Sequence, residues 1–147
     1  MNTYSQISIH AVFAVKHRKK LLTHDIRDDI HSYISGIILN LKLKPLAVGG
    51  WLDHVHIFFG MPVTCTISDI LRVVKGNSSR WINENNLISD TFKWQEGFGA
   101  FSYSITDRHK VIRYIQNQEE HHRYKNFEQE YIDLLNEFDV LYNDTYL

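Results

Sequence analysis

The chain of 147 residues is long enough to bury a sizeable core, and we expect one domain over residues 1–147. A hydrophobic fraction of 44% excludes disorder as the default state, and a net charge of −1 excludes a protein that coats nucleic acid non-specifically. The apolar runs are too short for a bilayer, the N-terminus lacks a signal-peptide pattern, and Cys65 has no partner cysteine, so we expect a cytoplasmic protein that needs no membrane.

The first half of the chain predicts a strand, a helix and a hairpin. Residues 3–15 are β-branched and aromatic, which favours a strand, and the basic "KHRKK" follows as a loop. Thr23 is a candidate N-cap for a helix that runs to about Leu43, where Pro45 closes it. "LAVGGW" and "HVHIFFGM" are typical of two strands, with a short connection at 52–53.

The second half predicts a helix, a strand and two more helices. The second helix begins after Thr64 or Thr66, and Gly76 is a weak point inside it. "FKWQEGFGAFSYSI" favours a fourth strand, bent or bulged at its glycines. "DRHKVIRYIQNQEEHH" predicts a third helix, and a last helix is expected over about 126–138.

This order, β-α-β-β-α-β-α with an additional C-terminal helix, predicts the fold class. Two β-α-β units around a hairpin are the split arrangement of ferredoxin-like α+β folds. We therefore expect an antiparallel sheet with helices on one face. The other face would be partly open, as a platform for a nucleic acid or a second subunit.

The most informative motif is the pair His54 and His56 in the third predicted strand. Alternation places both imidazoles on one face, opposite the apolar Val55, Ile57 and Phe59. Two neighbouring imidazoles can bind one divalent ion, and Asp53 could accept a hydrogen bond from a ring and orient it.

A third ligand must come from elsewhere, and the third helix offers several. Tyr114 and Gln118 are four residues apart and therefore share a helix face. His121, His122 and Glu119 are rival ligands on the same helix, and spacing alone does not select Gln118.

The residue types suggest phosphoryl chemistry. A metal on two histidines and an oxygen ligand keeps open positions and can polarise a phosphoryl oxygen. A nearby tyrosine can attack the phosphorus and form a phosphotyrosine. Together these parts describe DNA cleavage and rejoining.

The sequence at this point resembles a known family over nearly the whole chain. "DHVHIFF" resembles the His-hydrophobic-His motif of the HUH endonucleases, and "VIRYIQNQEEHH" resembles the Tyr-x-x-x-Gln helix of the single-tyrosine HUH transposases. "HAVFAVKHRKKLL", "VVKGNSSRWIN", "FKWQEGFGAFSYSIT" and "HHRYKNFEQEY" are similar to further family segments. The short C-terminus favours the insertion-sequence type over the related domesticated transposases.

The resemblance implies roles for four of these residues. Tyr114 would be the nucleophile that becomes linked to a 5′-phosphate of single-stranded DNA and leaves a 3′-hydroxyl. His54, His56 and Gln118 would hold magnesium or manganese. The resemblance also implies a homodimer that recognises hairpins at the ends of an insertion sequence.

DNA binding by a nearly neutral chain requires a local basic surface. The first candidates are four residues of the basic turn, Lys16, Arg18, Lys19 and Lys20. The next candidates are three residues of the second helix, Arg72, Lys75 and Arg80. Trp94 and Phe98 could stack on bases, although core or dimer packing explains them better.

Two other functions stay open on the residues alone. One is a ferredoxin-like module that holds nucleic acid without cutting it. The other is a small metal hydrolase that uses His54 and His56 with His121 or His122. On composition alone Tyr103, Tyr124 and Tyr131 are rival nucleophiles, but none has a Gln or His one helical turn away in a position over the histidine pair.

Overall fold

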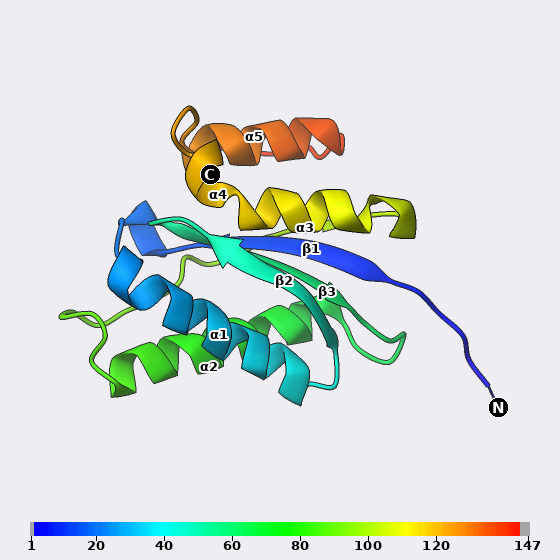
Figure 1. Ribbon diagram of the computed structural model, residues 1–147, viewed down its shortest axis with the longest axis horizontal. Helices are drawn as coiled ribbons and strands as arrows, with labels where there is room; N and C mark the ends of the chain where they lie inside the picture. Colours follow the sequence, from blue (N-terminus) through cyan, green and yellow to red (C-terminus); the bar gives the residue numbers. More distant parts are fainter. Residues whose placement is uncertain (1, 145–147) are drawn as a thin grey trace.

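A four-stranded antiparallel sheet forms the centre of the computed structural model, which describes residues 2–144 (Figure 1). The strand order is β2-β3-β1-β4, so the first strand and the histidine strand are the two central ones. The strands are β1 (Ser8–Ala14), β2 (Lys44–Gly50), β3 (His54–Gly60) and β4 (Gly99–Ser102). The predicted α+β fold class is confirmed.

The helices follow in the predicted order, with one extra break. They are α1 (His24–Asn40), α2 (Ile67–Glu84), α3 (Arg108–Gln116), α4 (Gln118–His121) and α5 (Phe127–Glu137). Two short 3-10 turns, η1 (Lys16–Arg18) and η2 (Ile105–Asp107), precede α1 and α3. Within the described residues, no helix has the length and apolar character needed to cross a membrane.

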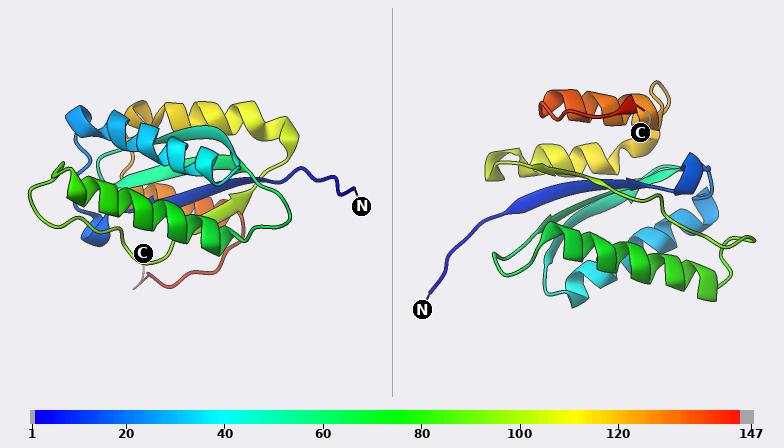
Figure 2. Two further views of the ribbon diagram at one scale, coloured as in Figure 1. Left: turned by 90° about the horizontal axis from the view of Figure 1, so that it is seen from below. Right: turned by 180° about the vertical axis from the view of Figure 1, so that it is seen from behind.

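The helices cover both faces of the sheet, which corrects the expectation of an open face (Figures 1 and 2). The helices α1 and α2 lie on one face, and α3, α4 and α5 lie on the other. The physical reason is that both faces carry apolar side chains. Phe58 on the second face packs under α3, and Val12 and Phe101 pack under α5.

Strand alternation separates the main core from the histidines. Ile57 and Phe59 of β3 face α1 and α2, together with Phe13 of β1. His54 and His56 therefore face the α3–α5 side, as the alternation predicts. Trp94 belongs to the main core, where its ring lies edge-on to Phe13 at 4.7 Å. This favours core packing over base stacking for Trp94.

Several element ends differ from the predictions. The first strand begins at Ser8 and not near residue 3. The helix α1 ends at Asn40 because the chain then turns through Lys42, whose φ of 61° is outside the helical region. Pro45 is consequently the second residue of β2, an edge strand that tolerates the missing N–H. The N-cap of α2 is Thr66, whose hydroxyl accepts a hydrogen bond from the backbone N–H of Asp69.

Gly49 lets α3 approach β2 closely. A Cβ atom at this position would lie 2.6 Å from the backbone oxygen of Ile115 and 2.9 Å from its Cγ2. We expect Gly49→Ala to lower the free energy of unfolding by about 1–3 kcal/mol, because the helix must shift. Urea denaturation measures this loss.

The matched control is Gly36→Ala in α1, where nothing lies within 4 Å of the added carbon. Alanine is the better helix former, so this variant should gain about 0.5–1 kcal/mol. Equal stability of the two variants would contradict the close approach of α3.

Candidate active site

The two histidines of β3 form the floor of the site. His54 and His56 are 0% exposed, and their rings lie 5.0 Å apart at an angle of 79°. The Nε2 atoms of both rings point to the same carboxylate oxygen, Oε1 of Glu130, at 3.1 and 3.2 Å. The two imidazoles therefore converge on one point, as a bidentate metal site requires.

Two neighbours orient these rings from behind. The carboxylate of Asp53 lies 2.8 Å from Nδ1 of His54, and Nε2 of His10 lies 2.8 Å from Nδ1 of His56. Burial, assisted by the charge of His56, holds the pKa of His10 well below its usual value, so His10 is neutral. When an ion is bound, protons on both Nδ1 atoms would leave the Nε2 lone pairs free to face it.

Gln118 enters the site at a break in the helix that the sequence pattern predicts as continuous. The expected single helix ends at Gln116, and Asn117 has φ −100° and ψ 25° before α4 begins. The Gln118 side chain is only 1% exposed. Its Oε1 lies 2.9 Å from Nε2 of His54, so Gln118 is placed beside the histidine pair.

The residue in the centre of the cluster is Glu130 of α5. Its Oε1 lies 3.2 Å from Nε2 of His122, in addition to the two contacts with β3. Its Oε2 accepts hydrogen bonds from the hydroxyl of Tyr114 and from the amide of Gln118, the latter at 3.0 Å. Glu130 thus touches the proposed metal ligands and the proposed nucleophile at once.

The electrostatics of the cluster follow from burial and these contacts. Burial alone would raise the pKa of the Glu130 carboxyl, but the surrounding histidines outweigh it and hold that pKa well below its usual range. Burial has the opposite effect on an imidazole and would lower the pKa of His54, but the carboxylates of Asp53 and Glu130 raise it to about 9. The pKa of His56 is lowered by its burial, against the pull of Glu130.

Tyr114 of α3 lies over the histidine pair of the same chain. Its ring is edge-on to that of His56 at 5.6 Å. Burial and the charge of Glu130 raise the pKa of the Tyr114 phenol far above its usual value, so the hydroxyl is a donor to the carboxylate. The helical spacing of Tyr114 and Gln118 is interrupted, but both side chains still reach Glu130.

The rival ligands occupy three different places. His122 reaches the centre, with Nε2 3.0 Å from Oε1 of Gln118. His121 lies at the rim, where Nε2 is 3.3 Å from Oε2 of Glu130 and the side chain is 28% exposed. Glu119 is exposed and is outside the cluster.

The rival tyrosines lie farther from the cluster. The ring of Tyr103 lies 6.0 Å from that of His10, and burial raises the pKa of its phenol to about 12. Tyr131 stacks on Phe127 at 5.5 Å, and Tyr124 is 85% exposed. None of these three takes the place of Tyr114 over the histidine pair.

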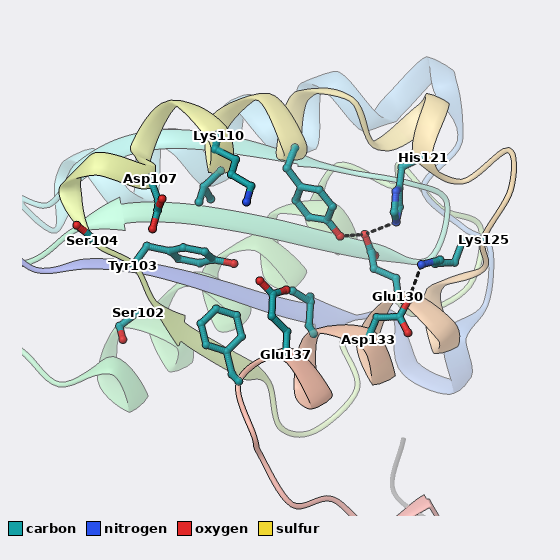
Figure 3. A pocket seen from close by; sticks show the side chains of 14 residues that line it. Ser102, Tyr103, Ser104, Asp107, Lys110, His121, Lys125, Glu130, Asp133 and Glu137 are labelled. Atoms are coloured by element: carbon teal, nitrogen blue, oxygen red, sulfur yellow. Dashed lines mark hydrogen bonds and ion pairs between the residues drawn. The ribbon is translucent and has the colours of Figure 1, made fainter.

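An open cavity of about 410 Å³ leads from the surface to this cluster (Figure 3). It lies between α3 and α5, and β4 contributes to its wall. Tyr103, Tyr114 and Glu130 are among the residues that line it. Tyr114 therefore borders a cavity that is open to solvent.

The basic turn lies next to the site. The end of β1 that leads into it pairs Ala14 with His54. The Arg18 guanidinium lies over the Phe127 ring at 5.6 Å, and that ring stacks on His54 at 4.2 Å. Lys16, Lys19 and Lys20 are exposed in the same turn.

The basic residues of α2 lie on the opposite face of the sheet. Arg72 is exposed and lies 3.6 Å from Asp69, and Arg80 donates to Asn77 at 2.8 Å. Lys75 has a structural contact, because its ammonium donates to the backbone oxygens of Gln95 and Gly97 at 2.7 and 2.8 Å. The seven basic candidates therefore do not form one surface.

Two polar residues of the site, His10 and Glu130, are not among the candidates predicted from the sequence. Each nevertheless stands out weakly from its neighbours in the sequence. His10 is a buried imidazole in a mostly apolar strand, "SIHAVFA". The buried residues that the structure describes in α5 are Phe127, Glu130, Leu134 and Leu135, so a carboxylate stands among three apolar side chains. A buried carboxylate needs a cation or hydrogen-bond donors beside it, so its position in an apolar helix face indicates a polar site.

The side chains present fit a hard divalent ion. His54, His122 and Glu130 each offer a ligand atom, and these atoms lie within 4.8 Å of one another. Imidazole nitrogen with carboxylate or amide oxygen is a donor set that suits manganese and magnesium.

Comparison with known proteins extends these observations. Residues 3–118 match the family described as "Transposase IS200 like". The ISDra2 transposase TnpA of Deinococcus radiodurans is 22% identical over 118 residues, which cover 77% of this chain and 84% of the relative.

Two solved structures share the fold. One, a transposase candidate from Deinococcus radiodurans R1, is 21% identical, has a TM-score of 0.66 and is matched over 80% of this chain and 95% of its own. The other is a REP-associated tyrosine transposase bound to a REP hairpin, 17% identical with a TM-score of 0.59, over 83% of this chain and 72% of its own. The family match spans most of the chain, and we conclude that this protein belongs to the family of IS200-like transposases.

Proposed function

We propose that this transposase cleaves and rejoins single-stranded DNA at the ends of an insertion sequence through a covalent 5′-phosphotyrosine on Tyr114. The observation that carries the proposal is the position of the Tyr114 hydroxyl, which Glu130 holds beside His54 and His56 in the lining of an open cavity. Residues 1–147 would act as one HUH transposase domain in the cytoplasm.

The chemical step exchanges one phosphate ester for another. The phenolic oxygen of Tyr114 forms a bond to phosphorus, the bond from phosphorus to the 3′-oxygen breaks, and that oxygen leaves as a hydroxyl after taking up a proton. The phenol gives up a proton to water and the 3′-oxygen takes one up from water, so no net proton is consumed, while the Glu130 carboxylate holds the phenol in place. Attack by a 3′-hydroxyl on the phosphotyrosine reverses the step and rejoins the strand.

The ion would be Mg²⁺ or Mn²⁺, held by His54, His56 and Gln118. When bound it supplies a Lewis acid that polarises a phosphoryl oxygen. Asp53 and His10 support this role by fixing the rings of the two histidines. Buried ligands with few alternative rotamers hold their positions before substrate arrives, which lowers the cost of reaching the reactive arrangement.

The DNA partner would be single-stranded DNA with hairpins at the element ends. The similar REP-associated tyrosine transposase, which is bound to a REP hairpin, supports this choice. We propose that the turn of Lys16, Arg18, Lys19 and Lys20 contacts the phosphates, since it borders the site. A homodimer would bring the two element ends together.

The basic turn gives a prediction about salt. The double variant Lys19→Ala and Lys20→Ala should bind hairpin DNA more weakly and reduce the slope of log Kd against log salt by about 2, because each lost phosphate contact releases about one counterion fewer. Fluorescence anisotropy over a salt series measures the slope. Arg72→Ala with Arg80→Ala, on the opposite face, is the matched control. If this pair lowers the slope as much, the turn is not the preferred contact.

The proposed function is tested by adduct formation. The protein is incubated with Mn²⁺ and single-stranded DNA that carries the flanks of its own gene, and the products are separated on a denaturing gel. We expect a slow protein–DNA band that depends on the metal. Retained hairpin binding with no band for any flank would favour a module that holds nucleic acid without cutting it.

A further inference from the structure

Glu130 lies outside the residues that match the family. The match ends at residue 118, so the family comparison says nothing about α5 or about His122. Yet Glu130 is 2% exposed and is the side chain that joins β3, α3 and α4. Its contacts call for an explanation beyond packing.

The first observation is how many nitrogens surround one oxygen. Oε1 of Glu130 lies 3.1 Å from Nε2 of His54 and 3.2 Å from Nε2 of both His56 and His122. A carboxylate oxygen has two lone pairs, so three imidazole donors exceed what it can accept in good geometry. Three nitrogens directed at one place are better explained as lone pairs arranged around a cation.

The second observation concerns distances. Neighbouring ligands of a six-coordinate Mg²⁺ or Mn²⁺ lie about 3 Å apart, since each is about 2.1 Å from the ion. The separations of 3.1 and 3.2 Å between Oε1 and the three nitrogens agree with this spacing. Gln118 Oε1, at 2.9 Å from His54 and 3.0 Å from His122, belongs to the same set.

The third observation is charge. His54, His56 and Gln118 are neutral ligands when they bind a metal, and hard divalent ions bind weakly to sites without an anionic oxygen. Glu130 supplies that negative charge inside a buried cluster, where an unpaired carboxylate would be costly. The bound ion would compensate the buried negative charge of Glu130, and the carboxylate would strengthen the binding of the ion.

We infer that Glu130 is an additional ligand of the divalent ion in this chain, through Oε1 and together with His122, while its Oε2 keeps the Tyr114 hydroxyl beside the ion. The inference rests on the proposed function for the identity of the nucleophile. It adds a ligand from α5 to the set that the sequence motifs indicate, and it makes α5 a necessary part of the site.

The experiment measures Mn²⁺ affinity without DNA, by isothermal titration of the full chain. We expect Glu130→Gln, which keeps the size and most hydrogen bonds, to weaken the Kd for Mn²⁺ at least tenfold. Glu119→Gln removes the same charge from an exposed position close to the site and should leave the Kd within twofold. Unchanged or tighter binding by Glu130→Gln would overturn the inference, because the carboxylate would then only compete with the ion for the histidines.

A second measurement covers the case in which Glu130→Gln does not fold. The unmutated chain is labelled with ¹³C at the glutamate carboxyl carbons, and electron–nuclear double resonance is recorded on bound Mn²⁺. A strong ¹³C coupling is expected from a directly bound carboxylate, and its absence would overturn the inference. Both measurements are independent of DNA cleavage, so a chain that forms no adduct can still support the ligand role of Glu130.

Discussion

Tyr114→Phe should abolish the covalent protein–DNA adduct. The change removes the phenolic oxygen and leaves the ring, which packs beside His56. Loss of a nucleophile lowers the rate of such reactions by about 10³-fold or more, so no band should remain on a denaturing gel. Hairpin affinity should be unchanged, because the change removes one hydroxyl and leaves the four basic side chains of the turn intact.

Tyr103→Phe is the matched control for this change. Tyr103 lines the same cavity and is also a phenol, but the structure places its ring beside His10 and Phe138. We expect this variant to form the adduct at nearly the normal rate. Loss of the adduct in Tyr103→Phe, with its persistence in Tyr114→Phe, would assign the nucleophile to Tyr103.

His56→Ala should remove metal binding and cleavage together. The side chain is 0% exposed, and its Nε2 is one of the nitrogens that converge on Glu130. Loss of this ligand should weaken Mn²⁺ binding at least tenfold, and the adduct rate should fall by about 10²-fold or more. Isothermal titration and a gel time course measure the two effects.

The control for the histidine change is His109→Ala, an exposed residue of α3. It should bind Mn²⁺ and form the adduct normally. If His56→Ala kept its adduct at a fixed low Mn²⁺ concentration, the histidine pair would be a structural feature of the core and not the metal site. Because removal of a buried imidazole also leaves a cavity, a melting curve must accompany the assay.

The local sequence pattern was sufficient to predict the features of the fold that depend on residues close together in the chain. Alternation in β3 places His54 and His56 opposite Ile57 and Phe59, and this needs no knowledge of tertiary structure. The cap of α2 at Thr66 follows from the same kind of local chemistry.

Features that depend on distant segments could not be predicted in this way. The contact of Glu130 with His56 joins residues 74 positions apart, and it exists because α5 folds back over the second face of the sheet. The helix break at Asn117 could not be predicted either, because no glycine or proline lies near it in the sequence. Lys75 is a candidate DNA contact on sequence grounds, whereas its ammonium donates to the backbone oxygens of Gln95 and Gly97 before β4.

The central claim, that Tyr114 carries the DNA, is tested most directly by mass spectrometry of the adduct. Digestion with trypsin and nuclease releases the peptide of residues 114–123, "YIQNQEEHHR", which contains a single tyrosine. We expect a nucleotide phosphate on this peptide, at Tyr114. A nucleotide on any other peptide, or on a histidine of this one, would contradict it.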